Sequence, residues 1–128
     1  MIESLFARID SKREELVSFT QELVRIPTIN PPGEDYLKCA ELLGNRLAKS
    51  GFSLLYERAN NTPGDSERYP RHNVIARIEG KHSGPCVHFN GHLDVVVTGN
   101  GWTVDPFEGL VRDGKIRSEE HTSELQSQ

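Results

Sequence analysis

The chain has 128 residues, of which 35% are hydrophobic and 27% are charged, and its formal net charge is −4. These values are typical of one globular domain or part of one, and they provide no basic surface that would bind nucleic acid. Because the sequence has neither a signal peptide nor an apolar run long enough to span a membrane, it predicts a cytoplasmic protein without a membrane partner.

Two amphipathic helices are predicted in the first part of the chain. One ends near Pro27, and the other closes at Ser50 and Gly51, where glycine can adopt a left-handed cap. Both are indicated by apolar residues at steps of three and four, which share one helical face. These residues are Leu16, Phe19, Leu23 and Ile26 in the first helix, and Tyr36, Ala40, Leu43 and Leu47 in the second.

Short extended segments follow the helices. Residues 52–58, 73–80 and 86–90 are rich in β-branched and aromatic residues, so they are predicted as strands, and residues 59–72 are predicted as a surface loop. The pair Asp113-Gly114 predicts the turn of a hairpin. Amphipathic helices combined with short apolar strands favour an α/β fold in which helices cover a mixed sheet.

The stretch "VHFNGHLDVV" carries the most informative pair of residues. His92 and Asp94 lie two positions apart, directly after Gly91 and the predicted strand at 86–90. In an extended backbone, residues two apart point to the same side, so the two side chains are expected to be neighbours. A neutral imidazole can bind Zn²⁺ through one nitrogen while a carboxylate orients it through the other. The pair therefore predicts a metal site, although the same spacing also occurs in ordinary surface pairs.

The cysteines leave a second metal arrangement open. Cys39 and Cys86 form neither a disulfide framework nor a Cys-x-x-Cys pair, and both are predicted to be reduced and buried. Cys86 and His88 alternate along the same predicted strand, however, so a one-metal module built from Cys86, His88 and His92 is an alternative.

Two segments resemble a known enzyme family. Residues 23–36, "LVRIPTINPPGEDY", and residues 88–116, "HFNGHLDVVVTGNGWTVDPFEGLVRDGKI", resemble the amino-terminal half of the two-zinc aminoacylase and carboxypeptidase family of metallopeptidases. This family includes acetylornithine deacetylase and succinyl-diaminopimelate desuccinylase. The resemblance implies that residues 1–116 are the incomplete amino-terminal part of a zinc-peptidase-like catalytic domain. It also implies that His92 is a zinc ligand and that Asp94 is the catalytic carboxylate that orients it.

The resemblance implies a metal-dependent deacylase or peptidase. Such an enzyme hydrolyses amide bonds in N-acyl amino acids or small peptides, with two zinc ions, for which cobalt can substitute, and the intact family enzyme can be a homodimer. Zinc lowers the pKa of a bound water to about 7 and polarises the scissile carbonyl. A catalytic zinc needs about three protein ligands, so His92 alone is too little and this chain is expected to be inactive. The alternatives are a non-catalytic binding domain that keeps the fold and the one-metal module.

The end of the chain departs from the family pattern. The family continues after the hairpin with a Tyr-Gly-Arg-Gly-type segment, whereas this chain continues with "RSEEHTSELQS", residues 117–127. These residues match the translation of a widely used short-read sequencing adapter. Residues 117–128 are therefore expected to be a non-native, disordered tail, and their acidic and histidine residues are not counted as metal ligands.

Overall fold

A computed structural model describes residues 2–118, so almost all of the tail attributed to the adapter lies outside the described residues. The described chain forms two compact units, one made of residues 2–26 and 98–118 and the other of residues 27–97. Within residues 2–118, no helix has both the length and the apolar character needed to cross a membrane.

The first unit contains two helices, α1 (Ile2–Asp10) and α2 (Arg13–Val24). α2 confirms the helix predicted to end near Pro27, and its C-cap is Arg25. α1 is not among the predicted elements, although apolar residues recur along it at steps of three and four, as in an amphipathic helix. They are Ile2, Leu5, Phe6 and Ile9, and all four are largely exposed.

A short hairpin completes the first unit. Its strands, β3 (Val111–Arg112) and β4 (Lys115–Ile116), pair in an antiparallel manner, as predicted. The two turn residues both have positive φ angles, 53° at Asp113 and 72° at Gly114, which a two-residue turn of this kind requires. The Gln21 side chain donates a 2.7 Å hydrogen bond to the carbonyl of Gly109, and this bond ties α2 to the segment before the hairpin.

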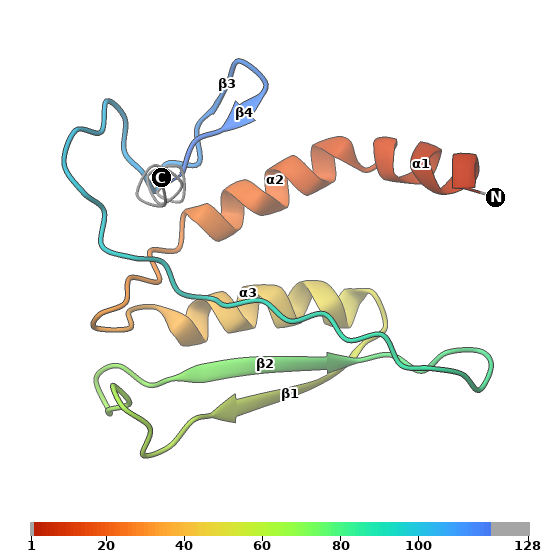
Figure 1. The fold of residues 1–128 in the computed structure, drawn as a ribbon, viewed down its shortest axis with the longest axis horizontal. Helices are drawn as coiled ribbons and strands as arrows, with labels where there is room; N and C mark the ends of the chain where they lie inside the picture. The colour runs from red at the N-terminus through yellow and green to blue at the C-terminus, as the bar shows by residue number, and fades with distance from the viewer. Residues whose placement is uncertain (1, 119–128) are drawn as a thin grey trace. The chain divides into compact units, whose positions relative to one another are not determined.

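The second unit consists of a helix and a two-stranded sheet. α3 (Tyr36–Lys49) is followed by β1 (Ser53–Arg58) and β2 (His72–Arg77), all close to their predicted bounds. Figure 1 shows α3 lying alongside the β1–β2 pair. The strands pair in an antiparallel manner, and the buried side chains of α3 form the small core. These core residues are Tyr36, Cys39 and Ala40.

Three expectations about the strands are corrected by the structure. Residues 86–90 form no strand, and the pairing within each of the two described sheets is antiparallel rather than mixed. A buried strand needs hydrogen-bonding neighbours, and none of the described residues pairs with this segment. Val87 and Phe89 are consequently 73% and 89% exposed. Cys86 is also exposed rather than buried, whereas Cys39 is buried as predicted and both thiols are free. The α/β class itself is confirmed.

Candidate functional site

The segment that carries His92 and Asp94 is held against residues 28–30. The amide of Val95 donates to the carbonyl of Thr28 at 3.0 Å, and the amide of Asn30 donates to the carbonyl of Val95 at 2.8 Å. The Thr28 hydroxyl donates to the carbonyl of Leu93 at 2.6 Å. Ile29 and Val95 thus form an isolated parallel bridge. These bonds position the His-x-Asp pair without the strand that was predicted to precede it.

His92 and Asp94 lie next to each other, as their spacing predicts. Nδ1 of His92 lies 2.8 Å from the carbonyl oxygen of Asp94 and 3.4 Å from its carboxylate oxygen Oδ1. Both oxygens can only accept a hydrogen bond, so this geometry favours the tautomer with its proton on Nδ1. The lone pair of Nε2 is then available, and the His92 side chain is 74% exposed.

Two neutral donors stabilise the charge of Asp94. The Asn30 amide donates to Oδ2 of Asp94 at 2.8 Å and is the main reason why the pKa of Asp94 is lowered. The Tyr36 hydroxyl also forms a hydrogen bond with Asp94. Burial raises the pKa of Tyr36, and the negative charge of Asp94 raises it further. Asp94 is therefore held ionised, although its side chain is 35% exposed.

Arg71 lies behind these two donors. Its Nη2 donates to Oδ1 of Asn30 at 3.0 Å, and its Nη1 donates to the Tyr36 hydroxyl oxygen at 2.6 Å. Its guanidinium also lies 5.0 Å from the centre of the Tyr36 ring. None of these three residues was predicted as a site residue, and Tyr36 was predicted only on the apolar face of its helix. Asn30 and Tyr36 occur in the family-like stretch 23–36, which could have indicated them, whereas Arg71 has no such signal.

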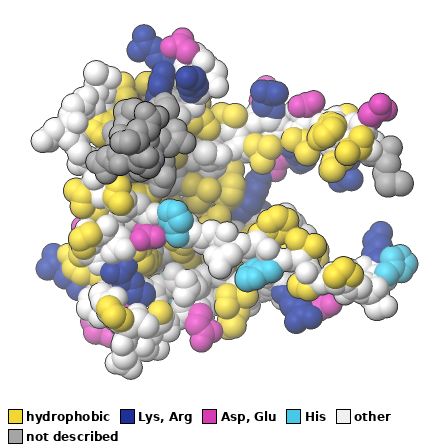
Figure 2. All heavy atoms as spheres, viewed as in Figure 1, with side chains coloured by type: hydrophobic (Ala, Val, Ile, Leu, Met, Phe, Trp, Pro, Cys, Tyr) yellow, Lys and Arg dark blue, Asp and Glu magenta, His cyan; other side chains and the backbone are white. Residues whose placement is uncertain are grey.

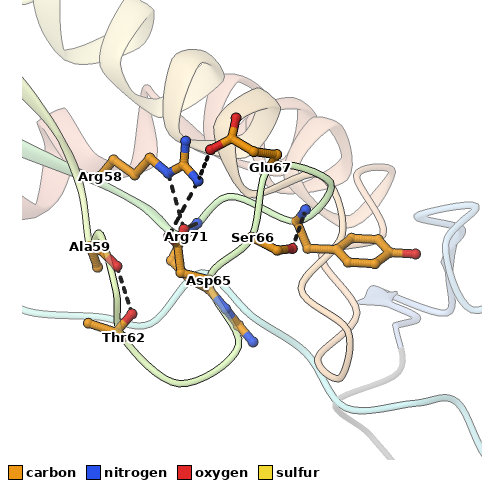
Figure 3. A network of polar contacts seen from close by, with 8 residues as sticks. Arg58, Ala59, Thr62, Asp65, Ser66, Glu67 and Arg71 are labelled. Atoms are coloured by element: carbon orange, nitrogen blue, oxygen red, sulfur yellow. Dashed lines mark hydrogen bonds and ion pairs between the residues drawn. The ribbon is translucent and has the colours of Figure 1, made fainter.

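The loop between β1 and β2 positions Arg71. Asp65 accepts bonds from Nε and Nη2 of Arg58 at 3.1 and 3.3 Å, and from the backbone amide of Arg71 at 3.0 Å. Figure 3 shows Arg58 directed toward both Asp65 and Glu67. The Asp65 side chain is only 7% exposed. Its contacts with Arg71 and Arg58 lower its pKa. The loop is therefore organised around one carboxylate.

The geometry of His92 is compatible with one ligand position of a metal site. His92 leaves Nε2 for a ligand bond, while Nδ1 lies 2.8 Å from the backbone carbonyl of Asp94 and 3.4 Å from its carboxylate, an arrangement compatible with a zinc ligand and its orienting partner. No group of three or more histidine, cysteine, aspartate or glutamate side chains among residues 2–118 is arranged to hold a metal ion. Cys86, His88 and His92 are thus not brought together as the one-metal module would require. The pair fits one ligand position but not a complete centre.

Comparisons with known proteins identify relatives that are several times longer. The chain is 30% identical, over 122 residues, to N-formyl-4-amino-5-aminomethyl-2-methylpyrimidine deformylase of Halalkalibacterium halodurans, covering 91% of the chain and 26% of that protein. It is 38% identical, over 99 residues, to succinyl-diaminopimelate desuccinylase of Methylobacterium radiotolerans, covering 75% and 22%. With the same enzyme of Acinetobacter baylyi, identity is 35% over 104 residues, covering 80% and 24%.

The chain spans about a quarter of the length of these relatives. No family model matches it. No solved structure matches it either. The curated relatives nevertheless agree with the resemblance that residues 23–36 and 88–116 carry. The chain is homologous to succinyl-diaminopimelate desuccinylase and to a deformylase of the M20/M40 peptidase family, which confirms the predicted family.

Proposed function

We propose that a full-length protein containing this sequence is a zinc-dependent hydrolase of amide bonds in N-acyl amino acids or small peptides. The names of the relatives describe the removal of a succinyl group or a formyl group, so acyl transfer to water is the chemistry they share. The single observation in the structure that supports the proposal is the His92–Asp94 pair, with Nδ1 of His92 facing Asp94.

The residues of this chain have distinct roles in that reaction. Zinc, when bound, supplies a water whose pKa is lowered to about 7 and a Lewis acid for the scissile carbonyl. His92 would be a ligand of that zinc through Nε2. Asp94 holds the imidazole in the correct tautomer through its backbone carbonyl, 2.8 Å from Nδ1, and its carboxylate, 3.4 Å from Nδ1. The carboxylate raises the basicity of the ring, and Asn30 and Tyr36 hold this carboxylate in place.

The rest of the centre comes from other parts of the protein. One histidine cannot retain a catalytic zinc, which needs about three protein ligands and an open position. We therefore expect residues 2–118 alone to be inactive, with the second zinc, the remaining ligands and the general base supplied elsewhere in the full-length protein. A cytoplasmic location and a homodimer belong to the same proposal.

Two substitutions in the full-length protein test the proposal. His92→Ala should lower the zinc content and nearly abolish hydrolysis of N-succinyl and N-formyl amines. Asp94→Asn should retain more zinc and still lose about 10- to 100-fold in activity, the usual cost of removing a group that orients a metal ligand. His82→Ala, a change at another exposed histidine, is the control and should keep both zinc and activity. Full activity in the His92 variant would refute the assignment.

A further inference from the structure

We propose that Arg71 is a positioning residue for Asp94, acting through Asn30 and Tyr36. The inference rests on the proposed function, because it assigns Arg71 to the support of the His92–Asp94 pair. All five residues belong to the compact unit formed by residues 27–97.

The contacts form a two-branched path from Arg71 to the carboxylate. One branch runs from Nη2 of Arg71 to Oδ1 of Asn30 at 3.0 Å, and from Nδ2 of Asn30 to Oδ2 of Asp94 at 2.8 Å. The other runs from Nη1 of Arg71 to the Tyr36 hydroxyl at 2.6 Å, and from that hydroxyl to Asp94. The two terminal nitrogens of one guanidinium therefore contact both donors that bind Asp94.

The polarity of these groups determines the direction of each bond. A guanidinium can only donate and a carboxylate can only accept, whereas an amide and a hydroxyl do both. Because Arg71 occupies the oxygen of Asn30, the amide NH₂ group is directed at Asp94. Because Arg71 donates to the oxygen of Tyr36, the hydroxyl proton is left for Asp94. Without Arg71, both groups could reverse or rotate and the carboxylate would lose its fixed partners.

The backbone leaves room for this guanidinium. Gly33 has a φ of +103°, and a Cβ atom there would lie 2.9 Å from Cζ of Arg71 and 3.0 Å from its Nη1. A larger residue would displace the side chain. The backbone amide of Arg71 is in turn held by Asp65 at 3.0 Å, and its Nε is buried. Arg71 is thus placed from both sides rather than lying freely on the surface.

Because the planar guanidinium of Arg71 holds two nitrogens in fixed positions, replacing Arg71 with lysine tests the positioning role. Arg71→Lys keeps the positive charge but replaces the planar fork, which holds two terminal nitrogens in fixed positions, with one ammonium on a flexible chain, so it should not hold both branches in the same geometry. Arg77→Lys is the matched control, because Arg77 is an exposed arginine at the end of β2 that pairs with Glu79 instead. The full 128-residue chain is compared in dilute solution, with a chelator present, by hydrogen–deuterium exchange and mass spectrometry.

In the Arg71→Lys chain, peptides that cover residues 91–97 should exchange roughly tenfold faster, because the loss of one charge-assisted hydrogen bond lowers their protection by about that factor. In the Arg77→Lys chain, the same peptides should exchange at the rate of the unsubstituted chain. Peptides from β1 and α3 should be unchanged in both. Equal acceleration of β1 and α3 would show a general loss of stability and overturn the proposal. Exchange of residues 91–97 that is unchanged in the Arg71→Lys chain would also overturn the proposal. The same holds if residues 91–97 of the unsubstituted chain already exchange as fast as an unfolded peptide.

A double-substitution cycle separates positioning from simple packing. In a chain that already carries Asn30→Ala and Tyr36→Phe, adding Arg71→Lys should leave the exchange of residues 91–97 unchanged, because both branches are already broken. If Arg71→Lys instead accelerates the exchange of residues 91–97 by the same factor with and without the other two substitutions, the proposal is overturned. Since neither metal nor substrate is present, a failure of the zinc hydrolase assignment would leave this result intact, and the two outcomes are distinguishable.

Discussion

At the scale of single residues, the β1–β2 loop is organised around one buried carboxylate, that of Asp65. Asp65 accepts three hydrogen bonds and is 7% exposed, whereas Glu67, which also pairs with Arg58, is 94% exposed. Exposed ion pairs contribute little to stability because water screens them, so the two carboxylates should differ in importance.

Asp65→Asn should open the loop between β1 and β2. The neutral amide of asparagine accepts weaker hydrogen bonds from Arg58 and from the backbone of Arg71 than the carboxylate does. Trypsin should therefore cleave the loop after Arg68 at least about threefold faster. Glu67→Gln, in the same loop, should change the rate little. Mass spectrometry of the first fragments checks this, and equal rates in the two variants would contradict it.

The same carboxylate predicts how protection of the loop depends on pH. Contacts with Arg71 and Arg58 lower the pKa of Asp65 in the folded chain. The stabilisation of the loop by Asp65 is therefore complete above the pKa of the unfolded state, about 3.9. It is lost as the pH falls through the lower pKa of the folded state. Hydrogen exchange of residues 59–71, corrected for the intrinsic rate at each pH, should show this loss, and the Asp65→Asn chain should lack it. An unchanged profile in that variant would exclude Asp65 as the titrating group.

At the scale of elements, the contact between α3 and β1 depends on the absence of a side chain at Gly44. A Cβ atom there would clash with the Tyr56 hydroxyl and lie 2.8 Å from Cζ of Tyr56 and 3.3 Å from Cδ1 of Leu54. Glycine within a helix lowers its intrinsic stability, so its presence in α3 is explained by this close approach.

Gly44→Ala should destabilise the second unit despite the better helix propensity of alanine. Overpacking costs about 1–3 kcal/mol and the propensity gain is about 1 kcal/mol, so we expect a net loss near 1 kcal/mol. Amide exchange in α3 measures this loss, and adding Tyr56→Leu should restore protection by removing the clashing hydroxyl. Protection equal to the unsubstituted chain in Gly44→Ala alone would show that Tyr56 moves aside without cost.

At the scale of the whole molecule, each of the two units leaves large apolar side chains exposed. In residues 27–97, the directly paired Leu55 and Ile75 are about half exposed, and Val87 and Phe89 are more so. Figure 2 shows hydrophobic side chains open at the surface of the extended segment that follows β2. Exposed apolar patches of this kind favour association.

The isolated 128-residue chain should therefore bind a hydrophobic dye in dilute solution or aggregate at higher concentration. Leu55→Thr combined with Ile75→Thr should lower dye fluorescence to about half, because threonine keeps a high strand propensity while removing apolar surface. Ser53→Thr, on the same strand, should leave fluorescence unchanged. A soluble monomer that melts sharply and binds no dye would contradict the prediction.

The origin of residues 117–128 can be tested on DNA. We propose that they are not native, because residues 117–127 match a translated adapter. Amplification of the source locus across the codon for Ile116 should give a different continuation, of the Tyr-Gly-Arg-Gly type. A native frame that encodes Arg-Ser-Glu-Glu-His at this point would refute the adapter hypothesis.

The sequence by itself determined the features that depend on neighbours along the chain. Apolar periodicity predicted α2 and α3, the Asp113-Gly114 pair predicted the hairpin turn, and the spacing of His92 and Asp94 predicted that they lie together. Each of these depends on local backbone geometry, which a few adjacent residues are enough to specify.

Only the tertiary structure decided which distant residues meet. Residues 86–90 have the composition of a strand but find no strand partner among residues 2–118, because a strand depends on partners that its own sequence does not contain. Arg71 lies 41 positions from Asn30, and Asn30 lies 64 positions from Asp94, yet hydrogen bonds connect all three. No local pattern encodes such contacts, since they arise when the β1–β2 loop and the segments at 28–30 and 91–95 fold together.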